Sequence, residues 1–224
     1  MTMHLRFRLA GIALTLGGIA AGICHLFSFE SSSDVSHLAQ YACFGEPIHL
    51  LLFASLVVVL LGWFEQYSLQ SSDSGVTGFT GFVCVFLGIL CGDLLHCILE
   101  FSVFPVLGSM VPYALPGIAD ATYHSAALGN LIWAGHCLMF VGSAATAMSI
   151  CRSRLLPIWT AAPFTLSATL LGLGLFPQFS AAIQSASLPT FYIAITMLGV
   201  SVLPAASAKP ATAGKESLAR AVAE

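Results

Sequence analysis

The sequence predicts an all-α integral membrane protein, a bundle of six transmembrane helices with both termini on the cytoplasmic side. Of its 224 residues, 58% are hydrophobic and 8% are charged, and the mean hydropathy is +0.93. A soluble domain carries about 25% charged residues, so this composition excludes a soluble globule and a disordered chain. The net charge of −3 leaves no basic surface for nucleic acid. The lipid bilayer is the expected partner.

Six apolar segments are long enough to cross a bilayer as helices, which takes about 17–25 residues each. None of them alternates in the manner of a barrel strand. The first segment is expected to be a retained span rather than a cleaved signal, because no small residue precedes Cys24. We expect one transmembrane domain over residues 1–208, followed by a flexible cytoplasmic tail over residues 209–224. The predicted spans are Leu9–Phe27, Pro47–Phe64, Gly78–Phe101, Leu128–Ile150, Leu156–Phe176 and Thr190–Ala206.

The cationic residues predict the orientation of the bundle. All seven lie before the first span, between the fourth and fifth spans, or in the tail, and six spans place these three regions on one side. The positive-inside rule makes that side cytoplasmic, together with the loop of residues 65–76. The expected location is a bacterial-type inner (plasma) membrane, crossed several times. The cations are Arg6, Arg8, Arg152, Arg154, Lys209, Lys215 and Arg220.

Acids and histidines collect on the opposite side, in the outer half of the first four spans. A charged group at the centre of a span costs about 2.5–3.5 kcal/mol on insertion scales, so such groups usually face the bundle interior and pair. The last two spans contain no acid and no His. This asymmetry predicts a polar site in the outer half. Its candidate metal ligands are His25, Glu46, His49, Asp93, His96, Glu100, His124 and His136, with Asp120 beside His124.

The spacing of these residues favours a metal centre. Glu46 and His49 are three residues apart, as are Asp93 and His96, and Glu100 follows His96 by four, so each set shares one helix face. The carboxylate-x-x-His spacing is similar to that of helical di-metal carboxylate proteins, in which facing helices present an oxygen and a nitrogen to a shared cation. Imidazole with carboxylate suits iron, copper or zinc. The resulting hypothesis is a metal-dependent membrane oxidoreductase, with no residue assigned a catalytic role.

Two alternatives remain open at this level. The first is a b-type haem electron-transfer protein with His96 and His136 as the axial pair, because the chain resembles four-helix b-type cytochromes in having transmembrane His on successive helices. The second is a transporter or structural subunit whose polar layer guides a proton or cation, or holds helices together.

The outer loop of residues 102–125 has three prolines among apolar residues and is either a plain linker or a lid over the polar layer. As a lid it would admit a quinone or another lipophilic small molecule. The chain is also a candidate subunit of a larger membrane complex. Trp63 and Tyr67 are expected to be interfacial anchors.

Overall fold

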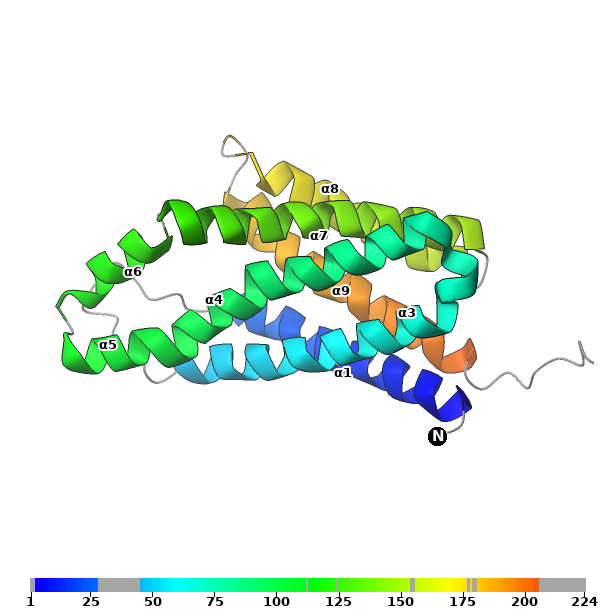
Figure 1. The fold of residues 1–224 in the computed structure, drawn as a ribbon, viewed down its shortest axis with the longest axis horizontal. Helices are drawn as coiled ribbons and strands as arrows, with labels where there is room; N and C mark the ends of the chain where they lie inside the picture. The colour runs from blue at the N-terminus through cyan, green and yellow to red at the C-terminus, as the bar shows by residue number, and fades with distance from the viewer. Residues whose placement is uncertain are drawn as a thin grey trace, which may run out of the picture.

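The computed structural model describes residues 3–27, 45–111, 113–123, 125–153, 156–176, 178 and 181–205. All secondary-structure elements in these ranges are helices (Figure 1). This confirms the predicted all-α class. Two short segments are π-helical, η3 (Ile89–Leu94) and η4 (Leu99–Val103). A third, η5 (Ile158–Thr160), is a 3-10 helix. The α-helices are α1 (Met3–Phe27), α3 (Glu46–Gly88), α4 (Leu95–Ile98), α5 (Phe104–Met110), α6 (Leu115–Tyr123), α7 (Ala126–Ser153), α8 (Ala161–Gly174) and α9 (Ala181–Ala205).

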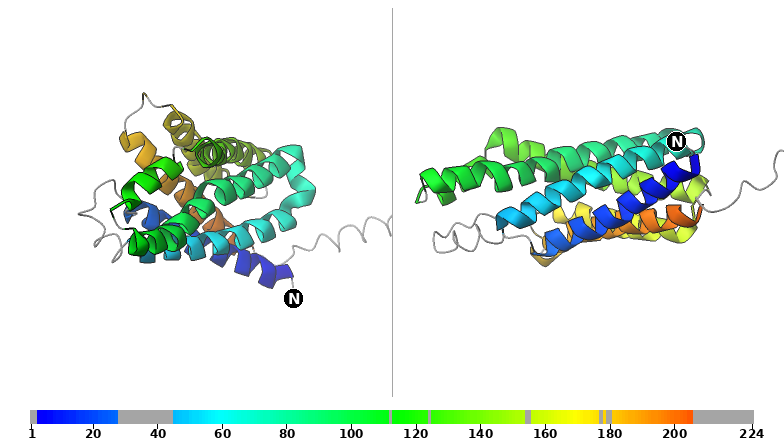
Figure 2. Two further views of the ribbon diagram at one scale, coloured as in Figure 1. Left: turned by 60° about the vertical axis from the view of Figure 1, so that its left-hand side comes forward. Right: turned by 90° about the horizontal axis from the view of Figure 1, so that it is seen from below.

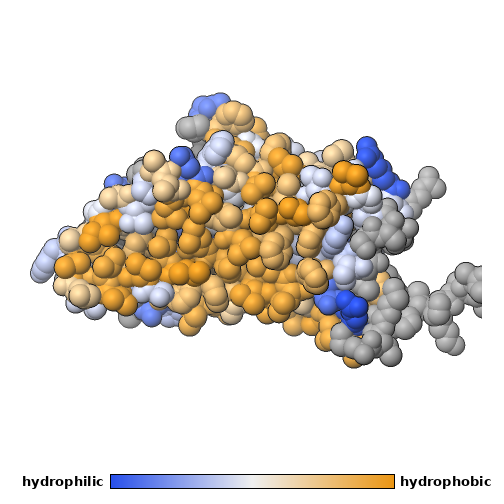
Figure 3. Space-filling model, in the orientation of Figure 1, coloured by the Kyte–Doolittle hydropathy of each residue, from blue (hydrophilic) through white to orange (hydrophobic). Residues whose placement is uncertain are grey.

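By length and composition, five helices in the described ranges can cross a membrane, so the chain is a multi-pass helical membrane protein. Figure 3 shows the broad hydrophobic surface that such helices present to lipid. The predicted fifth span is a shorter apolar helix, Ile158–Gly174, because Pro157 is extended (ψ 134°) and the helix begins only after it. The five long helices are Leu5–Phe27, Glu46–Ser68, Ser74–Met110, Ala126–Ser153 and Ser185–Pro204.

One end of the bundle gathers the start of α1, the corner of α3 and the end of α7. The Arg6 guanidinium lies 2.7 Å from a carboxylate oxygen of Glu65, and Arg152 donates a hydrogen bond of 3.0 Å to the Thr77 hydroxyl. Figures 1 and 2 show that the last turns of α9 lie at this same end. The start of α1, the end of α7 and the last turns of α9, which border the regions that the cation pattern places on one side of the membrane, therefore lie at one end of the described part of the protein.

The chain turns between two candidate spans within the expected loop of residues 65–76, but most of that segment is helical, because α3 continues up to a sharp turn. Gly75 makes that turn with φ 57° and ψ −164°, a conformation that is almost exclusive to glycine. The chain reverses its direction around this corner, and the two arms of α3 form an antiparallel helical hairpin (Figure 1).

The returning half of this hairpin widens into the two π-helical segments before α5. Pro105 occupies the first turn of α5 and has no N–H to donate to the carbonyl four residues earlier, which accounts for the wide turn of η4. In α9, by contrast, the helix passes through Pro189 and begins at Ala181 rather than at the expected Thr190. Membrane helices tolerate such internal prolines.

Glycines let the helices approach closely at the level of the polar residues. A Cβ atom added to Gly135 of α7 would lie 2.4 Å from the backbone nitrogen of Gly92 in η3. A Cβ atom on Gly18 of α1 would lie 2.5 Å from the Thr196 hydroxyl of α9. Close backbone approach of this kind is the usual way in which helices associate in lipid.

We expect Gly135→Ala to lower the free energy of unfolding by about 1–3 kcal/mol, because the new methyl group collides with the backbone of η3. Gly117→Ala in α6 is the matched control, since a Cβ atom there meets nothing within 4 Å. Unfolding of the purified protein by SDS in mixed micelles measures both. Equal stabilities of the two variants would contradict the close packing of α7 on η3.

Candidate functional site

The carboxylate of Asp93 in η3 is the point at which four helical segments meet. Its side chain is 3% exposed. The Oδ2 atom lies 3.3 Å from Nε2 of His25 in α1, and the Oδ1 atom lies 3.9 Å from Nε2 of His136 in α7. The third partner is Tyr192 of α9, whose hydroxyl donates a hydrogen bond to Oδ2. A carboxylate in the bilayer interior requires such partners, because no bulk water is present to solvate it.

Tyr192 organises this cluster and was not among the predicted site residues. Its ring is fully buried and is stacked on the His25 imidazole, with the centroids 5.2 Å apart and the planes inclined by 11°. The phenol thus contacts both members of the His25–Asp93 pair. We call Asp93, His25, His136 and Tyr192 the Asp93 cluster.

A second group of side chains forms around His49, which is fully buried near the start of α3. Its Nδ1 atom lies 2.8 Å from the carbonyl oxygen of Gly45. A carbonyl can only accept, so Nδ1 carries the proton, and in the neutral ring Nε2 keeps its lone pair. That Nε2 atom is buried and has no hydrogen-bond partner in the described part of the protein.

His96 of α4 lies against His49, with ring centroids 5.4 Å apart in an edge-to-face arrangement. It also interacts electrostatically with Glu100. Glu100 of η4 lies about two helical turns beyond Asp93 and is fully buried. We call His49, His96 and Glu100 the His49 cluster.

The structure thus divides the predicted polar layer. Six of the eight candidates belong to one cluster or the other. Glu46 opens α3 with Pro47 behind it, as expected, but within the described ranges it forms no hydrogen bond or ion pair with another candidate. His124 lies outside the described residues, and Asp120 is exposed on α6. The segment of residues 102–125, expected to be either a linker or a lid, contains the short helices α5 and α6, whose Phe104, Leu115 and Ala119 form a small apolar core of their own.

The side chains of the two clusters do not form a complete metal site in the described part of the protein. Among the residues that the structure describes, no group of three or more His, Cys, Asp or Glu side chains has the arrangement that would hold a metal ion. The potential ligand atoms nevertheless come from separate helices, so the two clusters are candidate sites of binding or proton transfer rather than finished metal cages.

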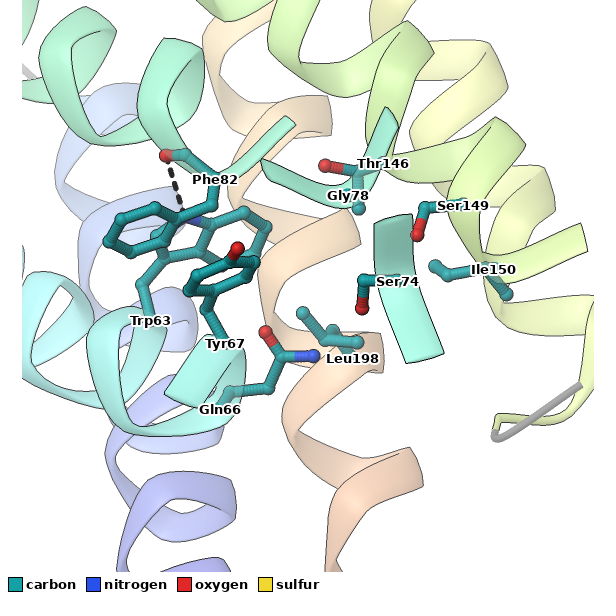
Figure 4. Close-up of a pocket in the computed structure, with 10 residues that line it drawn as sticks. All are labelled: Trp63, Gln66, Tyr67, Ser74, Gly78, Phe82, Thr146, Ser149, Ile150 and Leu198. Atoms are coloured by element: carbon teal, nitrogen blue, oxygen red, sulfur yellow. Dashed lines mark hydrogen bonds between the residues drawn. The ribbon is translucent and has the colours of Figure 1, made fainter. Parts of the chain in front are cut away.

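A small pocket of mixed lining lies at the other end of the bundle, near the Gly75 corner, and leaves about 20 Å³, room for about one water molecule. Figure 4 shows Gln66, Ser74, Thr146 and Ser149 around it. The expectation that Trp63 is an interfacial anchor is wrong. Its side chain is 2% exposed, and its indole N–H donates to the carbonyl of Phe82 over 3.2 Å.

Comparison of this chain with protein families, with curated proteins and with solved structures finds no match. The fold and the buried contacts define this chain as a multi-pass helical membrane protein with buried ionisable clusters.

Replacing Tyr192 by Phe removes the hydroxyl that donates to Asp93 and leaves the ring in place. We expect the free energy of unfolding to fall by about 1.5–3 kcal/mol, the usual contribution of a hydrogen bond to a charged group. Tyr113→Phe is the control, because Tyr113 is highly exposed. SDS unfolding of both variants makes the comparison, and an unchanged Tyr192→Phe protein would show that Asp93 does not depend on the phenol.

Proposed function

We propose that the protein binds a transition-metal ion in the outer half of its bundle and carries out redox or metal-dependent chemistry on a small or lipid-soluble substrate. The proposed ligands are His49 and His96, with Glu100 as the oxygen donor. Iron, copper and zinc suit this combination of imidazole and carboxylate.

The Nε2 atom of His49 is the observation that supports this proposal. It is buried, its lone pair has no hydrogen-bond partner in the described part of the chain, and the ring is oriented by Gly45. A metal-binding imidazole commonly donates its other N–H to a backbone carbonyl in this manner. An unused lone pair in an apolar interior is unfavourable, and a cation would satisfy it.

Two imidazoles and one carboxylate are the ligand set of several catalytic metal sites, which keep a further position open for water or substrate. A metal ion bound there would supply Lewis acidity or electron transfer. The surrounding apolar helices would exclude bulk water and admit a lipophilic molecule such as a quinone. Assembly with other subunits of a membrane complex is compatible with this role.

Haem b held by His96 and His136 is the second candidate, and two observations bear on it. The backbones of η3 and α7 are in contact at Gly92 and Gly135, the residue before His136. A porphyrin between these helices would require them to separate at that level. His136 also faces Asp93, whereas His96 faces His49. These contacts favour a non-haem ion at the His49 cluster.

For the topology, we propose six passes with both termini in the cytoplasm of a bacterial-type inner membrane, counting the short helix of residues 158–174 as the fifth pass. In support, its 17 residues extend about 25 Å at 1.5 Å per residue, close to the hydrocarbon thickness of about 30 Å. The polar layer would then lie toward the outer face.

Two variants separate the metal proposal from haem. Purified protein in detergent is analysed for metals and for its visible absorption spectrum. We expect His49→Ala to lower metal affinity by at least about tenfold, since even groups behind a ligand contribute that much, and His136→Ala to retain the ion. A Soret band lost in His136→Ala and kept in His49→Ala would establish haem instead.

The same preparations test the remaining alternative. Absence of bound metal from the wild-type protein, together with a His49→Ala variant whose stability is unchanged, would refute a metal centre. This pair of results would favour a structural subunit. Metal uptake by proteoliposomes along a metal gradient would establish transport rather than catalysis.

A further inference from the structure

One face of α1 points away from the bundle and carries a regular row of large apolar side chains. The helix packs between α3 and α9, and Figure 2 shows it on the outside of the bundle. Seven side chains on this face are 45–66% exposed in the described part of the protein, and they follow one another at alternating intervals of four and three residues. We call this set the α1 stripe, and it consists of Leu5, Leu9, Ile12, Leu16, Ile19, Ile23 and Leu26.

We propose that the α1 stripe is the interface through which two copies of this chain associate, with their α1 helices parallel and side by side in the membrane. Intervals of four and three residues repeat every seven, and this repeat keeps the same positions in contact along a left-handed pair of helices. All copies cross the membrane in the same direction. A two-fold axis along the membrane normal therefore places each stripe residue next to its own counterpart.

Small residues border the stripe on both sides. The positions next to it are occupied by Ala13 and Ala20 on one side and by Thr15 and Gly22 on the other. Large side chains flanked by small ones form the knobs and holes by which helices interlock, and small residues let two backbones approach in lipid. Contact with fluid lipid chains does not require this alternation, so the pattern favours a second helix as the occupant.

A hollow beside the C-terminal half of the stripe offers additional room for the partner helix. It has a volume of about 210 Å³ and lies between α1 and α9. Ile19 and Ile23 of the stripe line it together with Ile193 and Met197 of α9, and Gly22 in its wall has no side chain to fill it. A side chain from the second copy can enter this hollow without displacing an element of the bundle.

The stripe is long enough to hold two helices together through the whole apolar layer. From Leu5 to Leu26 it rises by about 32 Å at 1.5 Å per residue, which matches the hydrocarbon thickness of about 30 Å. The proposed contact is independent of the metal proposal, because no stripe residue belongs to the Asp93 cluster or the His49 cluster.

The polar groups beside the stripe are compatible with a parallel pair. Arg6 is already paired with Glu65 of its own chain. The parallel heptad register brings Arg8 next to Ala13 of the partner subunit rather than next to another cation. The Thr15 hydroxyl donates to the backbone carbonyl one turn earlier over 2.7 Å, so its burial leaves no donor unpaired.

The test counts copies per particle by single-molecule photobleaching of the full-length, fluorophore-labelled protein in liposomes, over a range of protein-to-lipid ratios. We expect the wild type to change from one copy to two as its density in the membrane rises. A variant with Leu16→Ala, Ile19→Ala and Ile23→Ala loses three consecutive knobs, and its dimer is expected to dissociate at least about tenfold more readily.

The matched control removes three exposed side chains from α3 instead, with Leu51→Ala, Val58→Ala and Leu61→Ala. This variant is expected to associate as the wild type does. A wild type that stays monomeric at every density, or equal association of the two triple variants, would overturn the interface.

Cysteine cross-linking in membranes tests the register with single substitutions that leave the stripe almost intact. The background carries Cys151→Ser, because the native Cys151 thiol is exposed. On oxidation with copper-phenanthroline, two thiols give up two protons and two electrons and form one disulfide. We expect a linked dimer with Leu9→Cys, Leu16→Cys and Ile23→Cys, and none above background with Leu61→Cys on α3. Cross-linking that is equally strong at Leu61→Cys would contradict the α1 stripe as the contact.

Discussion

The requirement to bury the carboxylate of Asp93 in an apolar bundle determines how the half of this protein that holds the polar layer is built. Without bulk water, a carboxylate has to be solvated by side chains, and here they come from three other helices, α1, α7 and α9. Tyr192 and Asp93 are 99 residues apart in the sequence, so this hydrogen bond exists only when α9 has packed against the middle part of the chain. Stability and the geometry of the polar layer consequently depend on the same contact.

Charged side chains are accommodated differently at the two ends of the bundle. At the end that holds the Gly75 corner, Arg6 and Arg152 are at the rim and reach partners on α3 through long flexible side chains. In the polar layer the groups are short, buried and fixed by their helices. Flexible exposed pairs contribute little to stability, whereas a buried group that loses its partner is costly. The rim can therefore tolerate change that the polar layer cannot.

Much of this arrangement is predictable from spacing and from counting passes. The convergence of His25, Asp93 and His136 follows from placing three helix ends on one side, and the structure brings these residues together. Tyr192 could not be predicted in this way, because a phenol has no charge and stands third in the expected span, where interfacial tyrosines are common. The division into two clusters depends on side-chain directions and on close backbone approach at Gly92, which residue counting does not contain. The expected span begins at Thr190, directly after Pro189, because proline commonly marks the end of a helix. In the structure α9 begins at Ala181, since helices in lipid accept internal prolines.

The wide π-helical turns have a consequence for the rotational phase of the returning half of the hairpin. An α-helix advances by about 100° per residue, and each wide turn takes up about one additional residue. Side chains beyond η4, which follow two such turns, are therefore rotated by about 200° from the positions that a uniform helix would give them. Phe104, directly after η4, is turned into the small core that it shares with Leu115 and Ala119. The returning half of the hairpin thus contributes side chains to two separate interiors. These are the ionisable layer and, beyond η4, the small apolar core.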